Sequence, residues 1–295
     1  MERRQIRSEE DVIVVETDSN RMISVIEGSP YLRHIIPEFF LDEKVDENRH
    51  LLGAYQGSPE FVSNDRITMV RANFESMDEG QICHLISYVL QKVILSNGFY
   101  MVHAGAVEKN GRATLLIGTS KMGKSTFGLE MALEKGCKLF GDDAIKLSVE
   151  DELVVKSGNT YVGLSQIHRS HERIKDRFPN GSPFRYLDSR SFGIHIRGPT
   201  SLKHVIFLEP DLLGLNNTQE IDNLNGRIRL YSAVSEETMA IGYCLMNDGV
   251  ALPSIGNSSN TQRLLESIKA SNINFFKVSG NFYRMLNDIE TIVNY

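Results

Sequence analysis

The hydrophobic positions in the first part of the chain come in short runs, separated by polar residues that favour turns. The runs at 12–15 and 22–26 flank a polar stretch, which is the spacing of a β-hairpin. A further apolar run at 67–70 predicts another strand. The residues up to about Ser8 are mostly polar and are expected to form a mobile tail. We therefore predict a small β-rich N-terminal domain over residues 1–90.

From residue 81 the apolar positions change to a helical period, which predicts a helix over 81–95. Beyond it, short apolar runs typical of strands alternate with one helix at 126–135. The strands are expected at 99–102, 106–108, 113–117, 137–140, 144–147 and 153–155. Asn110 and Gly111 form the two-residue turn typical of a hairpin. This alternation predicts an α/β domain over residues 91–295.

The last third of the chain is expected to add strands at 205–208 and 275–279 and helices at 261–270 and 282–293. The amide-rich stretch 216–225 is predicted to be a surface loop. The polar stretch 166–190 carries two prolines and is predicted to be a mobile loop. Its arginines suit a lid over a phosphate or an acidic peptide, although a solvated surface segment has the same composition.

One segment fits a phosphate-binding pattern in full. Residues 118–125 read G-x-x-x-x-G-K-S, with a predicted strand before them and a predicted helix after them. In that context the backbone N–H groups and the helix N-terminus surround one anion. The nucleotide-binding residues are therefore expected to be Gly118, Thr119, Ser120, Lys121, Met122, Gly123, Lys124, Ser125 and Thr126. Lys124 would meet the β- and γ-phosphates, and the Ser125 hydroxyl would bind Mg²⁺.

Three further residues lie at suggestive distances from this loop. His103 precedes Lys124 by one strand–turn–strand unit, and Asp142 and Asp143 follow it by one helix and one strand. A parallel strand would place the two aspartates beside the phosphates, where a carboxylate holds Mg²⁺ or accepts a hydroxyl proton. The alternatives are an ordinary turn after a strand and a structural histidine at a strand end.

The composition narrows the class of protein. With 41% hydrophobic and 24% charged residues among 295, the chain is expected to be globular. The formal net charge of −6 argues against a dedicated nucleic-acid binder. The three cysteines include no C-x-x-C pair, so neither a disulfide framework nor a zinc site is expected. We see no signal peptide and no membrane-spanning run, and we expect a cytoplasmic protein.

The runs 102–107, 116–126 and 139–143 together resemble the bacterial HPr kinase/phosphorylase superfamily, whose nucleotide-binding core is shared with phosphoenolpyruvate carboxykinases. The resemblance is specific over about 99–147 and suggestive to about 208. It implies a P-loop core of mixed β-sheet with flanking helices. The first ninety residues look more like the short β domain of stand-alone kinases of this group, including those that phosphorylate lasso-peptide precursors.

Carried over by position, the resemblance implies a kinase that uses ATP and Mg²⁺. His103 becomes an active-site residue near the transferring phosphate, Lys124 the phosphate-binding lysine and Ser125 a magnesium ligand. Asp142 becomes the catalytic acid/base, and Asp143 assists in binding metal or water. Arg197 is a further candidate for stabilising negative charge during transfer.

The chain departs from the family pattern at three places. Lys121 occupies a loop position that is usually glycine. His195 stands where the family has a metal-binding glutamate, in the run His195-Ile196-Arg197-Gly198, and imidazole is a poorer magnesium ligand than carboxylate. We expect His195 to lie close to the metal or phosphates. The stretch 253–257 has no basic residue where phosphorylase members carry arginines, so we expect no reverse activity.

Three functions remain open from the sequence. The first is a kinase that phosphorylates a Ser or Thr hydroxyl of a small protein or precursor peptide. The second is the same chemistry on a small-molecule hydroxyl such as serine or a sugar, which predicts a closed pocket in place of a long channel. The third is a nucleotide-binding regulatory protein with little catalysis. We expect neither a nucleic-acid nor a membrane partner, and the sequence leaves open whether the chain forms a homo-oligomer.

Overall fold

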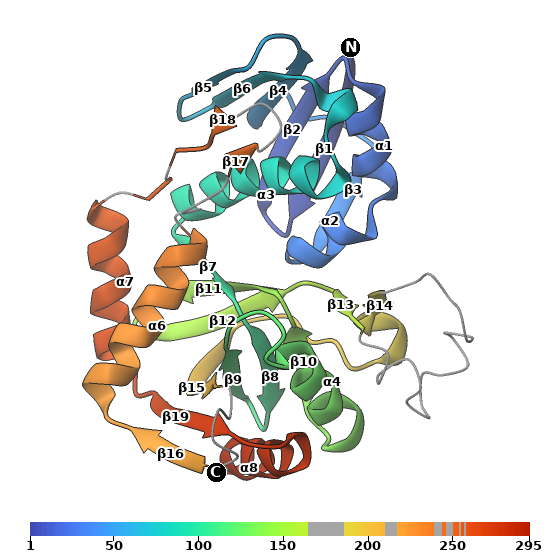
Figure 1. Cartoon of the computed structure of the whole chain (residues 1–295). Helices are drawn as coiled ribbons and strands as arrows, with labels where there is room; N and C mark the ends of the chain where they lie inside the picture. The colour runs from blue at the N-terminus through green and yellow to red at the C-terminus, as the bar shows by residue number, and fades with distance from the viewer. Residues whose placement is uncertain (165–185, 210–216, 239–243, 246–249, 254, 257) are drawn as a thin grey trace.

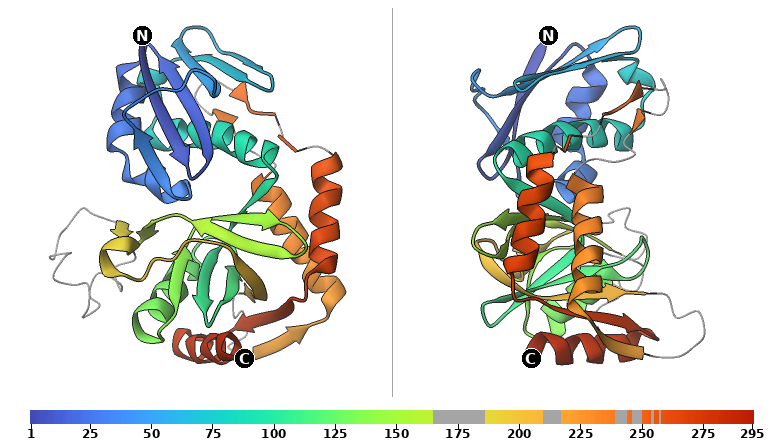
Figure 2. Two further views of the ribbon diagram at one scale, coloured as in Figure 1. Left: turned by 180° about the vertical axis from the view of Figure 1, so that it is seen from behind. Right: turned by 90° about the vertical axis from the view of Figure 1, so that its left-hand side faces the viewer.

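A computed structural model describes residues 1–164, 186–209, 217–238, 244–245, 250–253, 255–256 and 258–295. The chain builds two large β-sheets, which lie one above the other in all the views of Figures 1 and 2. The N-terminal sheet has six strands and the second sheet has nine. None of the helices in the described ranges combines the length and apolar composition needed to cross a bilayer.

The N-terminal sheet has the strand order β3-β1-β2-β4-β6-β5, and β2, β4 and β6 run parallel. Its strands are β1 Glu2–Ser8, β2 Asp11–Thr17, β3 Phe39–Asp42, β4 His50–Gln56, β5 Glu60–Ser63 and β6 Ile67–Ala72. The helices of this part are α1 Asn20–Gly28, α2 Pro30–Ile35, the 3₁₀ turn η1 Phe74–Ser76 and α3 Glu79–Ser96. Every residue of β2 is buried, as expected for a central strand with helices packed against it.

Two expectations for this part were wrong. The run 22–26 forms helix α1 rather than the second strand of a hairpin. Ser19 caps this helix by accepting a hydrogen bond from the Met22 N–H, and Met22, Ile23, Val25 and Ile26 all lie on its buried face. Residues 2–8 form strand β1, paired with both β2 and β3, rather than a mobile tail. The short apolar run fits a helix face as well as a strand, and the cap decided between them.

The second sheet has the main strand order β10-β8-β9-β15-β12-β11-β7, with β19 and β16 beyond β15. Its strands are β7 Phe99–His103, β8 Gly105–Lys109, β9 Arg112–Ile117, β10 Lys138–Gly141, β11 Ala144–Val149, β12 Leu153–Gly158, β15 Thr200–Leu208, β16 Asn217–Ile221 and β19 Asn274–Ser279. Strand β8 pairs in antiparallel fashion with both β9 and β10, so β9 and β10 run in the same direction. Their carboxyl ends therefore share one edge of the sheet.

Helices cover both faces of the second sheet (Figure 1). They are α4 Lys124–Glu134, α6 Asn223–Thr238, α7 Ser258–Ala270 and α8 Phe282–Asn294. Apolar residues of α6 and α7 share one buried cluster with β7, β11 and β12, while those of α4 and α8 share another with β9, β10 and β15. The arrangement is a mixed α/β layer structure, as the sequence predicts.

Most predicted elements of this part are confirmed, including the hairpin at Asn110 and Gly111, which have φ angles of 54° and 76°. The expectation of a surface loop over 216–225 was wrong, because β16 and the start of α6 lie there. Helix α6 was missed because only a few of its positions, such as Leu230 and Val234, are buried. The expected mobile loop 166–190 lies outside the described residues up to 185, and its end forms β14 Tyr186–Asp188 and the start of the 3₁₀ turn η3 Ser189–Phe192.

The described residues also form two small sheets of two strands each. One pairs β14 with β13 Tyr161–Gly163, and the other pairs β17 Cys244–Leu245 with β18 Val250–Ala251.

Candidate active site

The predicted phosphate loop joins the end of β9 to the start of α4, and the backbone at two of its positions explains why glycine stands there. Gly118 approaches β15 so closely that a Cβ atom would lie 3.0 Å from the Leu208 carbonyl oxygen. Gly123 caps α4 with a φ of 89°, which favours glycine. Lys121 has a φ of 69°, in the left-handed region that costs a non-glycine residue roughly 1–2 kcal/mol. A glycine at this position would avoid that cost.

The side chain of Lys124 folds back into the loop. Its Nζ donates hydrogen bonds to the carbonyl oxygens of Gly118, at 2.8 Å, and Thr119, at 3.3 Å. Burial lowers the pKa of the Lys124 ammonium, while the carboxylates of Asp143 and Asp142 act in the opposite direction. A buried cation at the start of a helix, surrounded by loop backbone, is a site for an anion such as phosphate.

Asp142 lies at the end of β10 and is fully buried, with a side-chain exposure of 0%. Its Oδ1 accepts a hydrogen bond from Asn159 Nδ2 at 2.7 Å, and its Oδ2 accepts one from the Gly163 N–H at 3.0 Å. The Ser125 hydroxyl is also within hydrogen-bonding reach of this carboxyl group. Burial raises the pKa of Asp142, against the effect of His34. The carboxyl group is therefore held tightly on every side.

Asn159 fixes the turn that carries both aspartates, and sequence reasoning missed it. Its Oδ1 accepts hydrogen bonds from the backbone N–H groups of Asp142 (3.0 Å), Asp143 (3.2 Å) and Ala144 (3.2 Å). The approach is close enough that a Cβ atom on Gly141 would lie 2.4 Å from this oxygen. The only local signal was an asparagine directly after a strand that ends in glycine, which is typical of many turns.

Asp143 is the accessible member of the pair. Its Oδ1 lies 2.9 Å from His103 Nδ1, and 24% of its side chain is exposed, with 43% for His103. Burial would raise the pKa of Asp143, but the hydrogen bond and charge of His103, with the charges of His34 and Lys124, bring it below its usual value. Asp143 is thus ionised at neutral pH and open to a reactant.

The N-terminal part contributes a histidine that sequence reasoning also missed. His34, on α2, has its Nδ1 at 2.7 Å from the Tyr161 carbonyl oxygen, so this nitrogen donates. The same nitrogen lies 3.5 Å from Asp142 Oδ1, and Nε2 lies 3.6 Å from Asp143 Oδ2. A single imidazole therefore contacts both aspartates from 108 or more positions away in the chain, a distance over which local sequence carries no signal.

Two of the predicted site residues, His195 and Arg197, do not belong to the cluster around Asp142 and Asp143. His195 Nε2 pairs with the buried Glu38 carboxylate, and its Nδ1 lies 3.2 Å from the Ser189 hydroxyl. Both ring nitrogens thus have protein partners. The run 194–196 pairs with Leu139 of β10, which brings His195 beside the strand that directly precedes Asp142. Arg197 is exposed, and it lines neither of the cavities described below.

A magnesium ion fits oxygen ligands that the loop and strand end bring together. The Ser125 hydroxyl and the Asp142 carboxyl group contact each other, and Asp143 is the next residue in the sequence. Mg²⁺ is commonly bound by one or two carboxylates together with substrate phosphates, so this set is chemically suitable. Within the described ranges no group of three or more His, Cys, Asp or Glu side chains is arranged as a metal site on its own.

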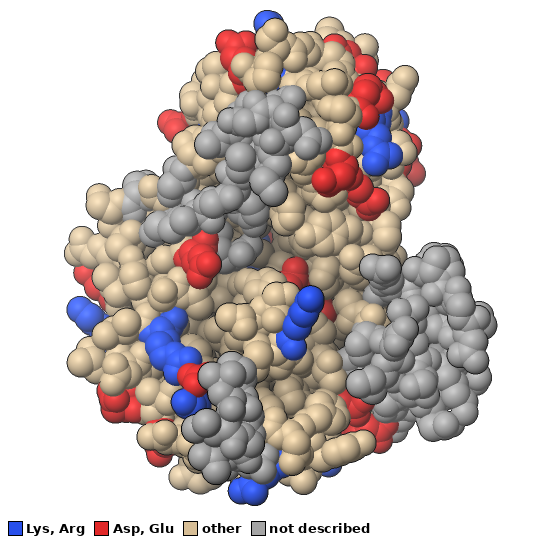
Figure 3. Space-filling view, in the orientation of Figure 1, with Lys and Arg blue, Asp and Glu red and all other residues tan. Residues whose placement is uncertain are grey.

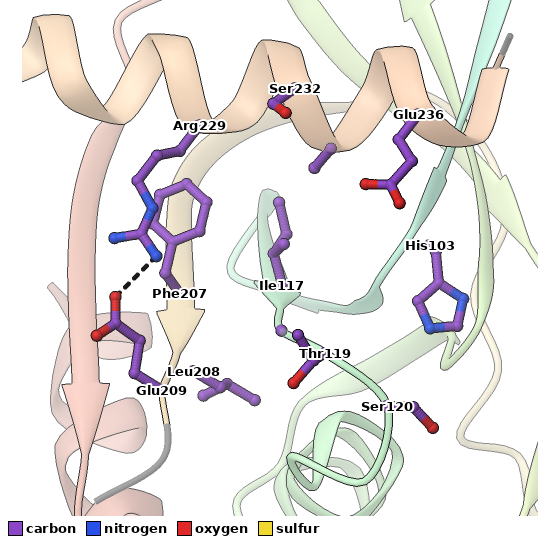
Figure 4. A pocket seen from close by; sticks show the side chains of 12 residues that line it. His103, Ile117, Thr119, Ser120, Phe207, Leu208, Glu209, Arg229, Ser232 and Glu236 are labelled. Atoms are coloured by element: carbon purple, nitrogen blue, oxygen red, sulfur yellow. Dashed lines mark hydrogen bonds and ion pairs between the residues drawn. The ribbon is translucent and has the colours of Figure 1, made fainter. Parts of the chain in front are cut away.

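Two cavities meet at His103. The larger has a volume of ≈ 760 Å³ and extends from the phosphate loop along β15 and α6 (Figure 4). The smaller has a volume of ≈ 160 Å³ and lies between the second sheet and the N-terminal helices, lined by Tyr31, Ile35, His84, Ser87, His103, Asp143 and Ala144. On the face seen in Figure 3, the described Lys and Arg side chains are scattered among acidic ones and form no extended basic patch.

Comparison with known proteins gives a distant likeness to solved structures only. No family model matches the chain, and no curated protein matches it. A solved structure that is similar, the Hpr(Ser) kinase/phosphatase from Coxiella burnetii, is 16% identical with a TM-score of 0.33. The likeness covers 66% of this chain and 93% of that chain. At this level it assigns no role to any residue, and the roles below rest on the site itself.

Proposed function

We propose that this protein is a kinase that transfers the γ-phosphoryl group of ATP to a hydroxyl group. The observation that carries the proposal is the meeting of an intact phosphate loop with a carboxylate–histidine pair. Lys124 and Ser125 lie on the loop, and Asp143 lies 2.9 Å from His103, which lines the ≈ 760 Å³ cavity together with Gly118, Thr119 and Ser120 of the loop. Phosphoryl transfer needs this combination of an anion-binding loop, cations and a nearby base.

In the proposed reaction the acceptor oxygen attacks the γ-phosphorus. The bond between that phosphorus and the bridging oxygen breaks, and ADP leaves with the bonding electron pair. The hydroxyl proton passes to a carboxylate, while Lys124 and the loop N–H groups stabilise the negative charge on the phosphoryl oxygens. When bound, Mg²⁺ would be held by Ser125 and Asp142 and would offset the charge of the phosphates.

Asp143 is proposed as the base, in exchange for the role that sequence reasoning gave to Asp142. The Asp142 carboxyl group accepts hydrogen bonds from Asn159 and Gly163, contacts Ser125 of the loop and is buried, so an acceptor substrate does not reach it. Asp143 lines the smaller cavity, and its contact with His103 orients the carboxylate. A base must reach the proton it removes, so accessibility decides in favour of Asp143.

We propose the same acceptor that the sequence led us to expect, a Ser or Thr hydroxyl of a protein or peptide. A small-molecule hydroxyl is the second candidate, and it is favoured by the ≈ 160 Å³ cavity beside Asp143. That cavity has room for a single side chain or a small molecule and is polar on the side of His84, Ser87 and Asp143. A regulatory protein without catalysis would have no need for a base beside such a cavity.

The test is a pair of substitutions at the two aspartates. Asp143→Asn is expected to leave ATP affinity within a few-fold while transfer falls by about 10²- to 10⁴-fold, the range for a lost general base. Asp142→Asn turns an amide toward the donors of Asn159 and Gly163, so it is expected to weaken Mg²⁺-dependent ATP binding and stability.

The measurements are ATP affinity by titration, ATP turnover, and mass-spectrometric detection of phosphate on L-serine, glycerol, glucose and a serine-containing peptide. Equal effects of the two substitutions on transfer per bound ATP would overturn the exchange of roles. A wild-type protein that binds ATP but neither turns it over nor phosphorylates any of these probes would support the regulatory alternative and contradict the kinase.

A further inference from the structure

The larger cavity has a wall that neither the phosphate loop nor the aspartates explain. Arg229, Ser232 and Glu236 of helix α6 line it, opposite Thr119 and Ser120 of the loop (Figure 4). Their spacing of three and four residues puts all three on one face of the helix. At 1.5 Å per residue, the seven positions from Arg229 to Glu236 span about 10 Å. The wall therefore continues well beyond the place of the phosphates.

The end of the wall away from His103 is a flat, fixed platform. The Arg229 guanidinium lies 4.1 Å from the centre of the Phe207 ring. Glu209 holds it there through a 2.8 Å contact and is itself held by Lys277 at 2.6 Å. A guanidinium plane fixed in this way is a surface on which a nucleic-acid base stacks.

The end of the wall near His103 is suited to hydroxyl groups. Figure 4 shows the Glu236 carboxylate directed toward His103, with Ser232 between it and Arg229. A carboxylate accepts two hydroxyl hydrogen bonds, as acidic residues do from the ribose of bound dinucleotides. The order along α6, from carboxylate to hydroxyl to guanidinium, therefore matches the order from ribose to base in a nucleotide whose phosphates lie on the loop.

Each of the two cavities is suited to one of the two substrates. The acceptor hydroxyl must contact Asp143, which lines the smaller cavity, so the larger one is left for the donor. We infer that the α6 wall is the nucleoside-binding half of the donor site, with the base stacked on Arg229 and the ribose at Glu236. This inference rests on the proposed ATP-dependent kinase function. The volume of the larger cavity, ≈ 760 Å³, lies in the usual range for ligand sites.

The test compares two probes that share phosphates but differ in the nucleoside, namely ATP and inorganic tripolyphosphate. Arg229→Ala removes the platform, and Ser232→Trp fills the middle of the cavity. Arg229→Ala is expected to weaken ATP binding by about 5- to 30-fold, the loss of a stacked cation contact. Ser232→Trp is expected to weaken ATP binding because the indole excludes the nucleoside. Both variants should leave tripolyphosphate binding unchanged. Lys124→Ala is expected to weaken both probes, because it acts on the phosphates.

Ile228→Trp is the matched control, since Ile228 lies on the same helix, is 56% exposed and does not line the cavity. It should leave both affinities unchanged, and thermal unfolding verifies that each variant is folded. If ATP binds to the wild type but Arg229→Ala and Ser232→Trp leave its affinity unchanged, or weaken both probes equally, the inference is overturned. A wild type that binds neither probe overturns the proposed function itself.

Discussion

The phosphate loop and the carboxylate cluster lie side by side but are built in different ways. The loop needs only the end of β9, eight consecutive residues and the first turn of α4, so its donors come from one short segment. The carboxylate cluster takes its parts from α2, β7, the β10–β11 turn and the segment around Asn159. The anion-binding half of the site is therefore a local structure, while the catalytic half depends on tertiary packing.

The difference extends to charge. The loop holds one buried cation, Lys124, bonded to its own backbone carbonyls. The cluster holds two adjacent carboxyl groups whose environments move their pKa values in opposite directions, upward for Asp142 and downward for Asp143. Adjacent carboxyl groups that differ in this way divide into a structural or metal-binding member and a base. Since His34 contacts both, the N-terminal part takes part in setting that division.

Beyond the two aspartate substitutions, the largest effect is expected on the loop side. Lys124→Ala removes the charge that meets the phosphates, and we expect ATP turnover to fall by about 10²- to 10³-fold, as for the loss of a transition-state donor. Turnover and ATP affinity measured together check this. The matched control is Lys121→Gly, which removes a lysine from the same loop. It relieves the positive φ and should raise stability by roughly 1 kcal/mol without lowering affinity. Equal loss in both variants would contradict the local account of the loop.

The second effect concerns His204 on β15, paired with Thr114 of the loop strand β9. Burial lowers the pKa of His204 to about 4, and neither ring nitrogen has a hydrogen-bond partner among the described residues. Since the folded pKa lies below the unfolded value of 6.5, stability is full above pH 6.5 and is lost as the pH falls toward 4. Over that range the loss is roughly 3 kcal/mol, at about 1.4 kcal/mol per unit.

The measurement is urea unfolding of the wild type and of His204→Phe between pH 7 and pH 4. Phenylalanine has no proton to bind in this range, so the variant should lose less stability than the wild type on acidification. Parallel curves for the two proteins would mean that His204 is not the residue whose protonation weakens the sheet.

The same contrast explains what the sequence predicted and what it did not. The loop, the hairpin at Asn110 and the strand before Asp142 all carry local signals, and all are present in the structure. Helix α1 was mistaken for a strand because a run with four apolar positions fits either period, and only the Ser19 cap distinguishes them. Helix α6 was missed because its cavity-facing side is polar, which left too few apolar positions to reveal its period.

The missed site residues have a common cause. His34 and Asn159 act through contacts with the turn at Asp142 that only the folded chain creates. Asp142 and Asp143 are consecutive in the sequence, but which of them is accessible depends on the contacts of Asn159 and Gly163 with Asp142. Glu38 was hidden for the same reason, since it precedes its partner His195 by more than 150 positions.

The third effect tests whether α2 contributes to catalysis. His34→Ala removes the ring that contacts both aspartates, and we expect transfer to fall by about 10- to 100-fold, as for partners that orient catalytic ligands. ATP affinity should change little, because the loop is untouched. Arg33→Ala is the matched control on the same helix, where Arg33 packs over the rings of Phe39 and Tyr161. His34 is a positioning residue, so its loss should also shift the pH profile of transfer. An unchanged rate and profile would restrict the catalytic cluster to the second sheet.

The smallest effect is expected at Glu38, which stands beside the position where the resemblance leads one to expect a metal-binding glutamate. Glu38 is buried, has a φ of 44° and pairs with His195 across the two parts of the chain. Glu38→Gln keeps the shape and one hydrogen bond but removes the charge. We expect a loss of about 1 kcal/mol in the free energy of unfolding, the difference between a charge-assisted and a neutral hydrogen bond. Transfer and its Mg²⁺ dependence should stay close to wild type, as measured by urea unfolding and a Mg²⁺ titration of turnover. If Mg²⁺ affinity collapses while the fold is intact, then the N-terminal part supplies a carboxylate to the metal site. In that case the metal-binding half of the site is as dependent on tertiary contacts as the base.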